Sequence, residues 1–193
     1  TCALPIYETT GPRATRTADS YLTDDWREKG LLDLFRKDYA ERRSGKVIVR
    51  PSPLPVEDFM DGYIGRKAVE FISEYRDPRP ICLFVGFSGP HDPWDAPGEY
   101  ATMYDPDQTP PPIPISPRRQ ALPDPVRDKP DFAVEEGLTD EDIRMIRANY
   151  YGKISFVDHW CGEILKAFAD RGWLDDLLVV FWSDHGEMAG DHG

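Results

Sequence analysis

Cysteines and long apolar runs are both scarce in this 193-residue sequence. The three cysteines, Cys2, Cys82 and Cys161, form no CxxC pair and have no spacing typical of a zinc knuckle, which excludes the common cysteine-based zinc sites. No apolar run approaches the roughly 20 residues that a transmembrane helix needs, so we expect no membrane span in these residues. The odd number of cysteines leaves the cellular compartment open.

Basic residues are also in short supply. The chain has 23 Lys and Arg against 35 Asp and Glu, a net charge of −12, and its longest basic cluster is only Arg42, Arg43 and Lys46. A protein this acidic is a poor ligand for polyanions, so a nucleic-acid partner is not expected. An anionic substrate would have to be attracted by local positive charge, such as that of a metal ion.

Four segments have the sequence pattern of α-helices. Short helices are predicted over about 23–29, ending at Gly30, and over about 31–43. Residues 56–75 carry apolar side chains at about the 3.6-residue spacing of a helix that is buried on one side. The longest predicted helix begins at a capping-box sequence, residues 139–142, and ends at Gly172.

Two short segments, 81–87 and 177–182, carry no polar side chain. This composition is typical of strands that are covered on both faces, as in a parallel sheet, and 46–50 is a third, shorter candidate. The order strand, loop, long helix, strand implies a right-handed crossover between two parallel strands. The predicted fold class is therefore α/β, with a largely parallel central sheet and helices on both faces.

Residues 89–136 contain twelve prolines in 48 residues. Proline is not tolerated in helix interiors or central strands, so this segment is predicted to be a long loop at the surface. Long loops in compact enzymes commonly form walls of the active site, and we expect that role here. Trp94 and Tyr100 near its start favour a packed loop over a disordered one.

Polar side chains follow both predicted strands, and in open α/β sheets ligands bind beyond the carboxyl ends of the strands. Asp184 and His185 follow the second strand and offer one carboxylate oxygen and one imidazole nitrogen, which suit Ca²⁺, Mg²⁺, Mn²⁺ or Zn²⁺. His91 follows the first strand and has the chemistry of a proton donor near neutral pH. A solvated turn at the strand end and a structural histidine in the loop are the alternative interpretations of these residues.

Three segments together resemble the sulfatase family. They are FVGFSGPHDPWDAPGEYATMYDP (84–106), NYYGKISFVDHWCGEIL (149–165) and LLVVFWSDHGEMAGDHG (177–193). The resemblance implies an alkaline phosphatase-like fold in which Asp184 and His185 match two ligands of a single divalent metal, commonly Ca²⁺. It also implies that His91 contacts the sulfate group or protonates the leaving oxygen.

The implied reaction is hydrolysis of a small-molecule or carbohydrate sulfate ester by a formylglycine nucleophile. None of the three cysteines stands in the CxPxR motif that yields formylglycine. We therefore expect residues 1–193 to be a fragment of a single catalytic domain, truncated at both ends and inactive alone, with the formylglycine upstream. A phosphodiesterase or phosphonate monoester hydrolase of the same superfamily and a non-catalytic binding member are the alternatives. The oligomeric state is left open.

Overall fold

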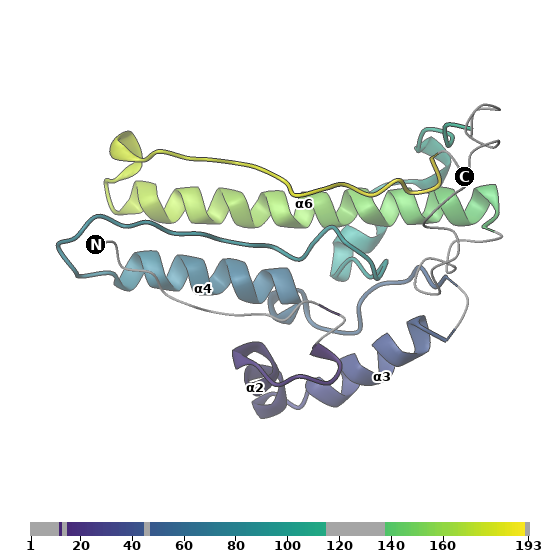
Figure 1. Cartoon of the computed structure of the whole chain (residues 1–193), viewed down its shortest axis with the longest axis horizontal. Helices are drawn as coiled ribbons and strands as arrows, with labels where there is room; N and C mark the ends of the chain where they lie inside the picture. The colour runs from purple at the N-terminus through teal and green to yellow at the C-terminus, as the bar shows by residue number, and fades with distance from the viewer. Residues whose placement is uncertain (1–11, 13–14, 45–46, 115–137, 192–193) are drawn as a thin grey trace, which may run out of the picture.

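The computed structural model is built around two long helices that lie side by side. They are α4 (Met60–Glu74) and α6 (Asp140–Asp170), and a second pair, α2 (Tyr21–Glu28) and α3 (Leu32–Arg42), lies beneath α4 (Figure 1). Short 3₁₀ helices occupy Val56–Asp58, Gly98–Thr102, Pro106–Gln108 and Leu174–Asp176. The structure describes residues 12, 15–44, 47–114 and 138–191. No helix in these ranges is both long and apolar enough to cross a membrane.

The predicted helices are confirmed, because their start and stop signals are local. At the start of α6, the Oγ1 of Thr139 accepts the Asp142 N–H at 3.2 Å, and the Asp142 carboxylate accepts the Thr139 N–H at 2.9 Å. Gly172 follows the end of this helix with a φ of +68°, a conformation that glycine adopts without strain. The predicted helix over 56–75 begins with a 3₁₀ turn and becomes α-helical at Met60.

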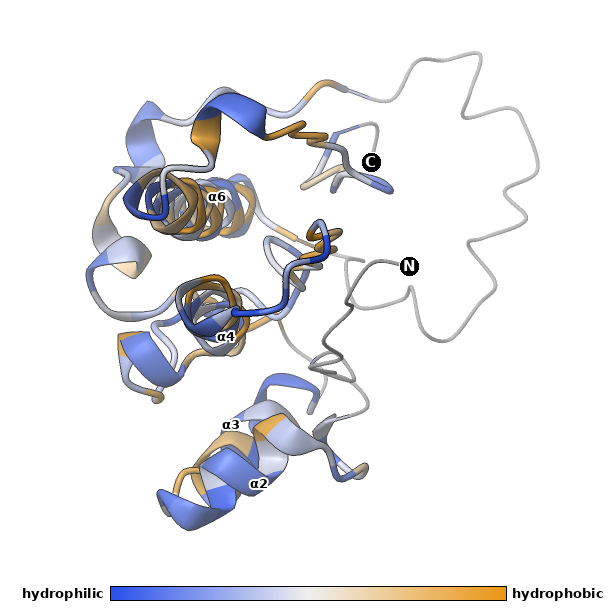
Figure 2. Ribbon diagram, turned by 90° about the vertical axis from the view of Figure 1, so that its left-hand side faces the viewer, coloured by the Kyte–Doolittle hydropathy of each residue, from blue (hydrophilic) through white to orange (hydrophobic). Residues whose placement is uncertain are grey.

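The predicted parallel sheet is wrong for the described part of the chain. Residues 81–87 and 177–182 are extended, but apart from an isolated bridge at Ile81 they form no β-strand, and no backbone hydrogen bond joins them. Residues 47–50 are likewise extended without forming a strand. The two longer segments run in the same direction beside α4 and α6, and both lie on one side of the helix pair (Figures 1 and 2). The described structure is thus mostly helical.

Most side chains of these two segments are exposed, because no neighbouring strand among the described residues covers them. Ile81 and Leu83 pack against the cluster around Ile72 and Phe168, whereas Phe84 is 70% exposed. The side chains over 178–182 are between 56% and 86% exposed. A strand in a sheet needs hydrogen-bonding neighbours, and the described residues provide none at these edges. The sequence showed that these segments are suited to burial but not which residues would cover them.

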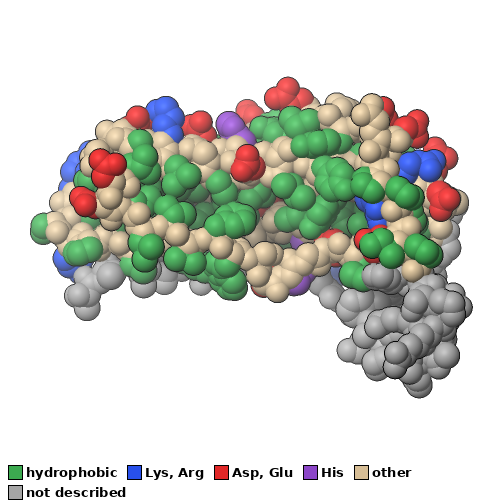
Figure 3. Space-filling view, turned by 90° about the horizontal axis from the view of Figure 1, so that it is seen from above, with side chains coloured by type: hydrophobic (Ala, Val, Ile, Leu, Met, Phe, Trp, Pro, Cys, Tyr) green, Lys and Arg blue, Asp and Glu red, His purple; other side chains and the backbone are tan. Residues whose placement is uncertain are grey.

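Hydrophobic side chains extend along much of the molecule in the space-filling view (Figure 3).

The proline-rich loop packs onto α6 in its described part, 89–114. Trp94 is buried, and the ring of Tyr100 stacks edge-on against Phe156 of α6 with centroids 5.0 Å apart. Residues 115–136 of the predicted loop lie outside the described residues. Its role as a wall of the active site stays a prediction.

Two glycines of α6 provide a matched test of this packing. A Cβ at Gly152 would lie 2.0 Å from the carbonyl oxygen of Tyr100, whereas a Cβ at Gly162 would have no neighbour within 4 Å. We expect Gly152→Ala to lower the free energy of unfolding by about 1–3 kcal/mol, since the loop must move away. Gly162→Ala should raise it by roughly 0.5–1 kcal/mol, because alanine is the better helix former. Urea unfolding followed by tryptophan fluorescence measures both, and equal stabilities of the two variants would contradict the described contact.

Candidate active site

The ends of the two extended segments meet at one place. His91 follows the first segment and His185 the second, and their rings lie edge to face with centroids 5.8 Å apart. Glu187 adds a carboxylate whose Oε1 lies 3.9 Å from the His91 Nε2. Asp184 stands next to His185, with its Oδ2 3.8 Å from the His185 Nε2. The structure therefore brings His91, Asp184 and His185 together without a sheet between them.

His91 is held through one of its ring nitrogens. Its Nδ1 lies 2.7 Å from the Asp92 carboxylate and 3.0 Å from the Asp92 carbonyl oxygen. The hydrogen bond to Asp92 raises the pKa of His91 to about 9, although partial burial acts in the opposite direction. A protonated imidazole donates from both nitrogens, so Nε2 is left as the donor that faces the other segment end.

Asp184 and His185 have donors that fit a divalent metal. The Nδ1 of His185 lies 3.1 Å from the Gly186 carbonyl, an arrangement that leaves Nε2 as the coordinating nitrogen. The Asp184 Oδ2 lies 3.8 Å from this nitrogen, so the two residues could hold one divalent cation, which would supply positive charge at this place. No group of three or more His, Cys, Asp or Glu side chains suited to a metal occurs in the described ranges. These two residues therefore fit part of a metal site, and further ligands are needed.

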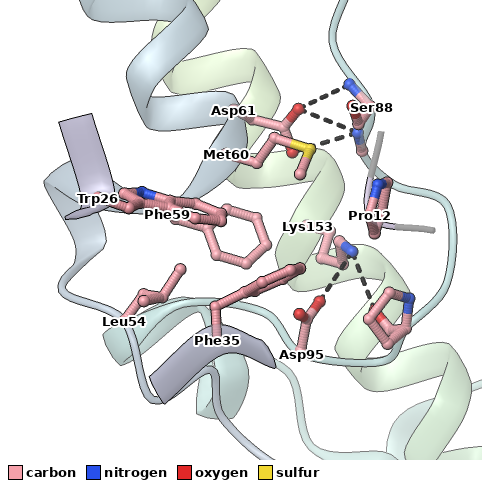
Figure 4. Close-up of a pocket in the computed structure, with 12 residues that line it drawn as sticks. Pro12, Trp26, Phe35, Leu54, Phe59, Met60, Asp61, Ser88, Asp95 and Lys153 are labelled. Atoms are coloured by element: carbon pink, nitrogen blue, oxygen red, sulfur yellow. Dashed lines mark hydrogen bonds and ion pairs between the residues drawn. The ribbon is translucent and has the colours of Figure 1, made fainter. Parts of the chain in front are cut away.

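Two buried charged residues hold the loop that carries His91. The carboxylate of Asp61, from α4, accepts the N–H groups of Ser88 at 2.7 Å and Gly89 at 3.0 Å (Figure 4). The ammonium group of Lys153, from α6, donates to the carbonyl oxygens of His91 at 2.7 Å and Pro93 at 3.0 Å. The loop is thus fixed on both sides of His91 by two different helices.

The charges behind the loop are partly balanced. Lys153 also pairs with the buried Asp95 at 3.0 Å, so all three of its donors have partners. Burial raises the pKa of Asp61, while the positive charge of Lys153 and the two backbone N–H groups oppose that effect. A Cβ at Gly89 would lie 2.6 Å from the Asp61 Oδ2, so a larger residue at this position would displace the Asp61 carboxylate.

A small cavity of about 10 Å³ lies among Asp61, Asp95, Lys153 and apolar side chains of α2 and α3. This is room for about one water molecule, and the cavity lies behind the loop, away from the exposed ring of His91. It is therefore not a candidate for substrate binding.

The segment that contains Glu187 is anchored further along the chain. Arg147 of α6 donates to the carbonyl oxygen of Ala189 at 2.9 Å and pairs with Asp191 at 2.5 Å. The same guanidinium binds the Pro110 carbonyl at 2.8 Å, so it ties the proline-rich loop to this segment.

Sequence reasoning missed the residues that support His91. Asp92 and Glu187 stood beside the predicted site residues and needed only the folded geometry to show their contacts. For Lys153 there was a signal, because a lysine on the apolar stripe of a long helix, between Ile146 and Phe156, is unusual unless it has a partner. Asp61 gave no such signal, because an acidic residue in the first turn of a helix is common, and only the structure shows that Asp61 is buried.

Comparison with known proteins identifies relatives for most of the chain. A multifunctional alkaline phosphatase superfamily protein, PehA of Trinickia caryophylli, is 32% identical over 74% of this chain and 30% of that protein. An arylsulfatase of Clostridium perfringens is 31% identical over 67% of this chain and 27% of the arylsulfatase. The crystal structure of a phosphonate monoester hydrolase of Agrobacterium radiobacter has a TM-score of 0.73 at 24% identity, over 89% of this chain and 37% of that chain.

This chain thus spans about a third of the length of these relatives. The model of the Sulfatase family matches residues 22–193, which is nearly all of this chain. The chain therefore belongs to the Sulfatase family, within the alkaline phosphatase superfamily.

Proposed function

We propose that this chain supplies His91, Asp184 and His185 to the active site of a sulfate ester hydrolase. The observation that carries the proposal is the convergence of His91 and His185, from distant parts of the sequence, with ring centroids 5.8 Å apart. The family membership supports a hydrolase of this superfamily. The proposed substrates are small-molecule or carbohydrate sulfate esters.

In the proposed reaction, His91 acts on the leaving group. Its Nε2 donates a proton to the alcohol oxygen as the sulfur–oxygen bond breaks, so that the alcohol departs neutral. The Nδ1 stays bound to Asp92 and keeps the ring in place. The half-exposed position of His91 at the end of its segment gives a substrate access to the ring.

Asp184 and His185 would be two of the ligands of a divalent metal, which the family typically uses. We propose Ca²⁺, the metal that the resemblance to sulfatases implies. Mg²⁺, Mn²⁺ and Zn²⁺ are the alternatives, because a carboxylate oxygen suits Ca²⁺, Mg²⁺ and Mn²⁺ and an imidazole nitrogen suits Zn²⁺. A metal bound there would polarise the sulfate oxygens. Since no cysteine of this chain stands in a CxPxR motif, the proposed reaction needs a formylglycine from outside these 193 residues.

A second candidate is a phosphodiesterase or phosphonate monoester hydrolase. At the proposed metal site this chain has an Asp followed by a His, Asp184 and His185, whereas many arylsulfatases have an Asp followed by an Asn. The Asp-His pair fits the second candidate at least as well. The similarity to PehA, a multifunctional alkaline phosphatase superfamily protein, also favours a broad range of esters. A non-catalytic binding member is a third possibility, and a full-length sequence without a CxPxR or CxSxR motif would identify it.

Side-by-side kinetics on three esters test the proposal in a full-length enzyme that contains this chain. We expect kcat/KM to be highest for an aryl sulfate, lower for an aryl phosphodiester and lowest for an aryl phosphate monoester. The first two substrates carry one negative charge and the third nearly two, and a chain of net charge −12 favours the lower charge. Highest turnover of the diester would favour the second candidate, and highest turnover of the monoester would contradict both.

A further inference from the structure

We propose that Asp92 and Arg43 are positioning residues for His91. Asp92 sets the direction of the His91 ring, and Arg43 holds the Asp92 carboxylate in the orientation that this requires. The inference rests on the proposed function of His91 and adds two residues to it, one of them at the end of α3, 49 positions away in the sequence.

The Asp92 carboxylate is shared between two cationic groups. Its Oδ1 lies 2.7 Å from the His91 Nδ1, and its Oδ2 lies 3.1 Å from the Nη1 of Arg43. Because each oxygen has its own partner, rotation of the carboxylate would break both contacts. Asp92 and Arg43 are each about one-third exposed or less, so water competes less with this pair than with a fully exposed ion pair.

Arg43 is itself placed by a buried anchor. It follows α3, and the preceding residue, Arg42, donates to the carbonyl oxygens of Trp94 at 3.1 Å and Pro51 at 3.1 Å. Trp94 belongs to the same loop as His91 and Asp92. The end of α3 is therefore fixed to the loop that Arg43 reaches.

This arrangement decides which nitrogen of His91 is available. The Nδ1 is occupied by Asp92, whereas the 3.9 Å between Nε2 and the Glu187 carboxylate is too long for a hydrogen bond. The Nε2 therefore faces the end of the opposite segment without a hydrogen bond to Glu187. If the imidazole ring of His91 turned over, Nε2 would point away from the segment that contains Glu187, and the donor facing that segment would be lost.

The electrostatics of Asp92 support its role. Burial alone would raise the pKa of Asp92, but the hydrogen bond from His91 and the charges of His91 and Arg43 lower it overall. The carboxylate thus stays ionised at neutral pH and keeps accepting from both partners.

A double-mutant cycle tests the positioning role in the full-length enzyme. We expect Asp92→Asn to lower kcat on an alkyl sulfate by roughly 10- to 100-fold, within the range of general acid catalysis, and to leave KM and the turnover of 4-nitrophenyl sulfate nearly unchanged. Arg43→Met should have a smaller effect of the same selectivity, and Arg43→Lys should restore part of the loss. In a His91→Ala background neither change should lower kcat further.

Arg144→Met is the control, since Arg144 of α6 forms a longer and more exposed ion pair with Asp107, at 3.5 Å, and it should leave both substrates unaffected. Equal losses on both esters, or additive losses in the His91→Ala background, would overturn the positioning role and show a merely structural one. If Arg43→Met does not fold, as judged by thermal unfolding, Asp92→Asn and Arg43→Lys decide the question. If the enzyme turns over phosphodiesters and no sulfate ester, the proposed function fails, and the same cycle on an alkyl and an aryl phosphodiester still tests Asp92 and Arg43.

Discussion

A full-length enzyme that carries Asp184→Ala should retain little bound divalent metal and lose at least about 100-fold in kcat/KM. Loss of an outer-shell partner of a metal ligand typically costs roughly 10- to 100-fold, and a direct ligand should cost no less. The Asp184 side chain is 80% exposed, and its polar contacts within the described residues are with the adjacent His185. Its removal should therefore change the metal content without disturbing the fold.

Elemental analysis after dialysis measures the metal, and thermal unfolding monitored by circular dichroism checks the fold. Asp158→Ala is a suitable control, because Asp158 is an exposed carboxylate on α6 and should leave the metal content unchanged. A wild-type metal content in the Asp184→Ala variant would remove Asp184 from the metal site. Metal loss in both variants would point to a general effect of the acidic surface.

The helices could be predicted from the sequence because each is specified by neighbouring residues. The start of α6 depends on a reciprocal bond between Thr139 and Asp142, and its end depends on Gly172, so every signal lies within or next to the helix. The extended segments are different, since a strand is defined by hydrogen bonds to another segment. Residues 81–87 and 177–182 have the composition of strands, but composition does not name a partner.

The candidate site likewise has residues that could be predicted from the sequence and residues that could not. His91 and Asp184–His185 could be found because polar residues directly after apolar segments are noticeable in the sequence. Their support could not be found that way: the Asp61 carboxylate reaches Ser88 across 27 positions of sequence, and Lys153 reaches the His91 carbonyl across 62. Such contacts depend on how α4 and α6 pack, which the spacing of apolar residues does not determine.

His91→Ala should separate substrates by the quality of their leaving group. On an alkyl sulfate, whose alkoxide is a poor leaving group, we expect kcat to fall by about 10²- to 10⁴-fold, the usual contribution of a positioned general acid. On 4-nitrophenyl sulfate the leaving phenolate needs little protonation, so the loss should stay within about tenfold. The expectation rests on the Nε2 of His91, which lies 3.9 Å from Glu187 in the segment that carries His185 and has no hydrogen bond to it.

Steady-state kinetics on a series of sulfate esters with graded leaving-group pKa provide the measurement. The variant should show a steeper dependence of kcat on leaving-group pKa than the wild type, because it must expel the alcohol as an anion. His159→Ala is the matched control, since His159 is an exposed histidine on α6, and its slope should equal that of the wild type. A parallel drop for all esters in His91→Ala would mean that His91 binds the sulfate group and does not protonate the leaving oxygen.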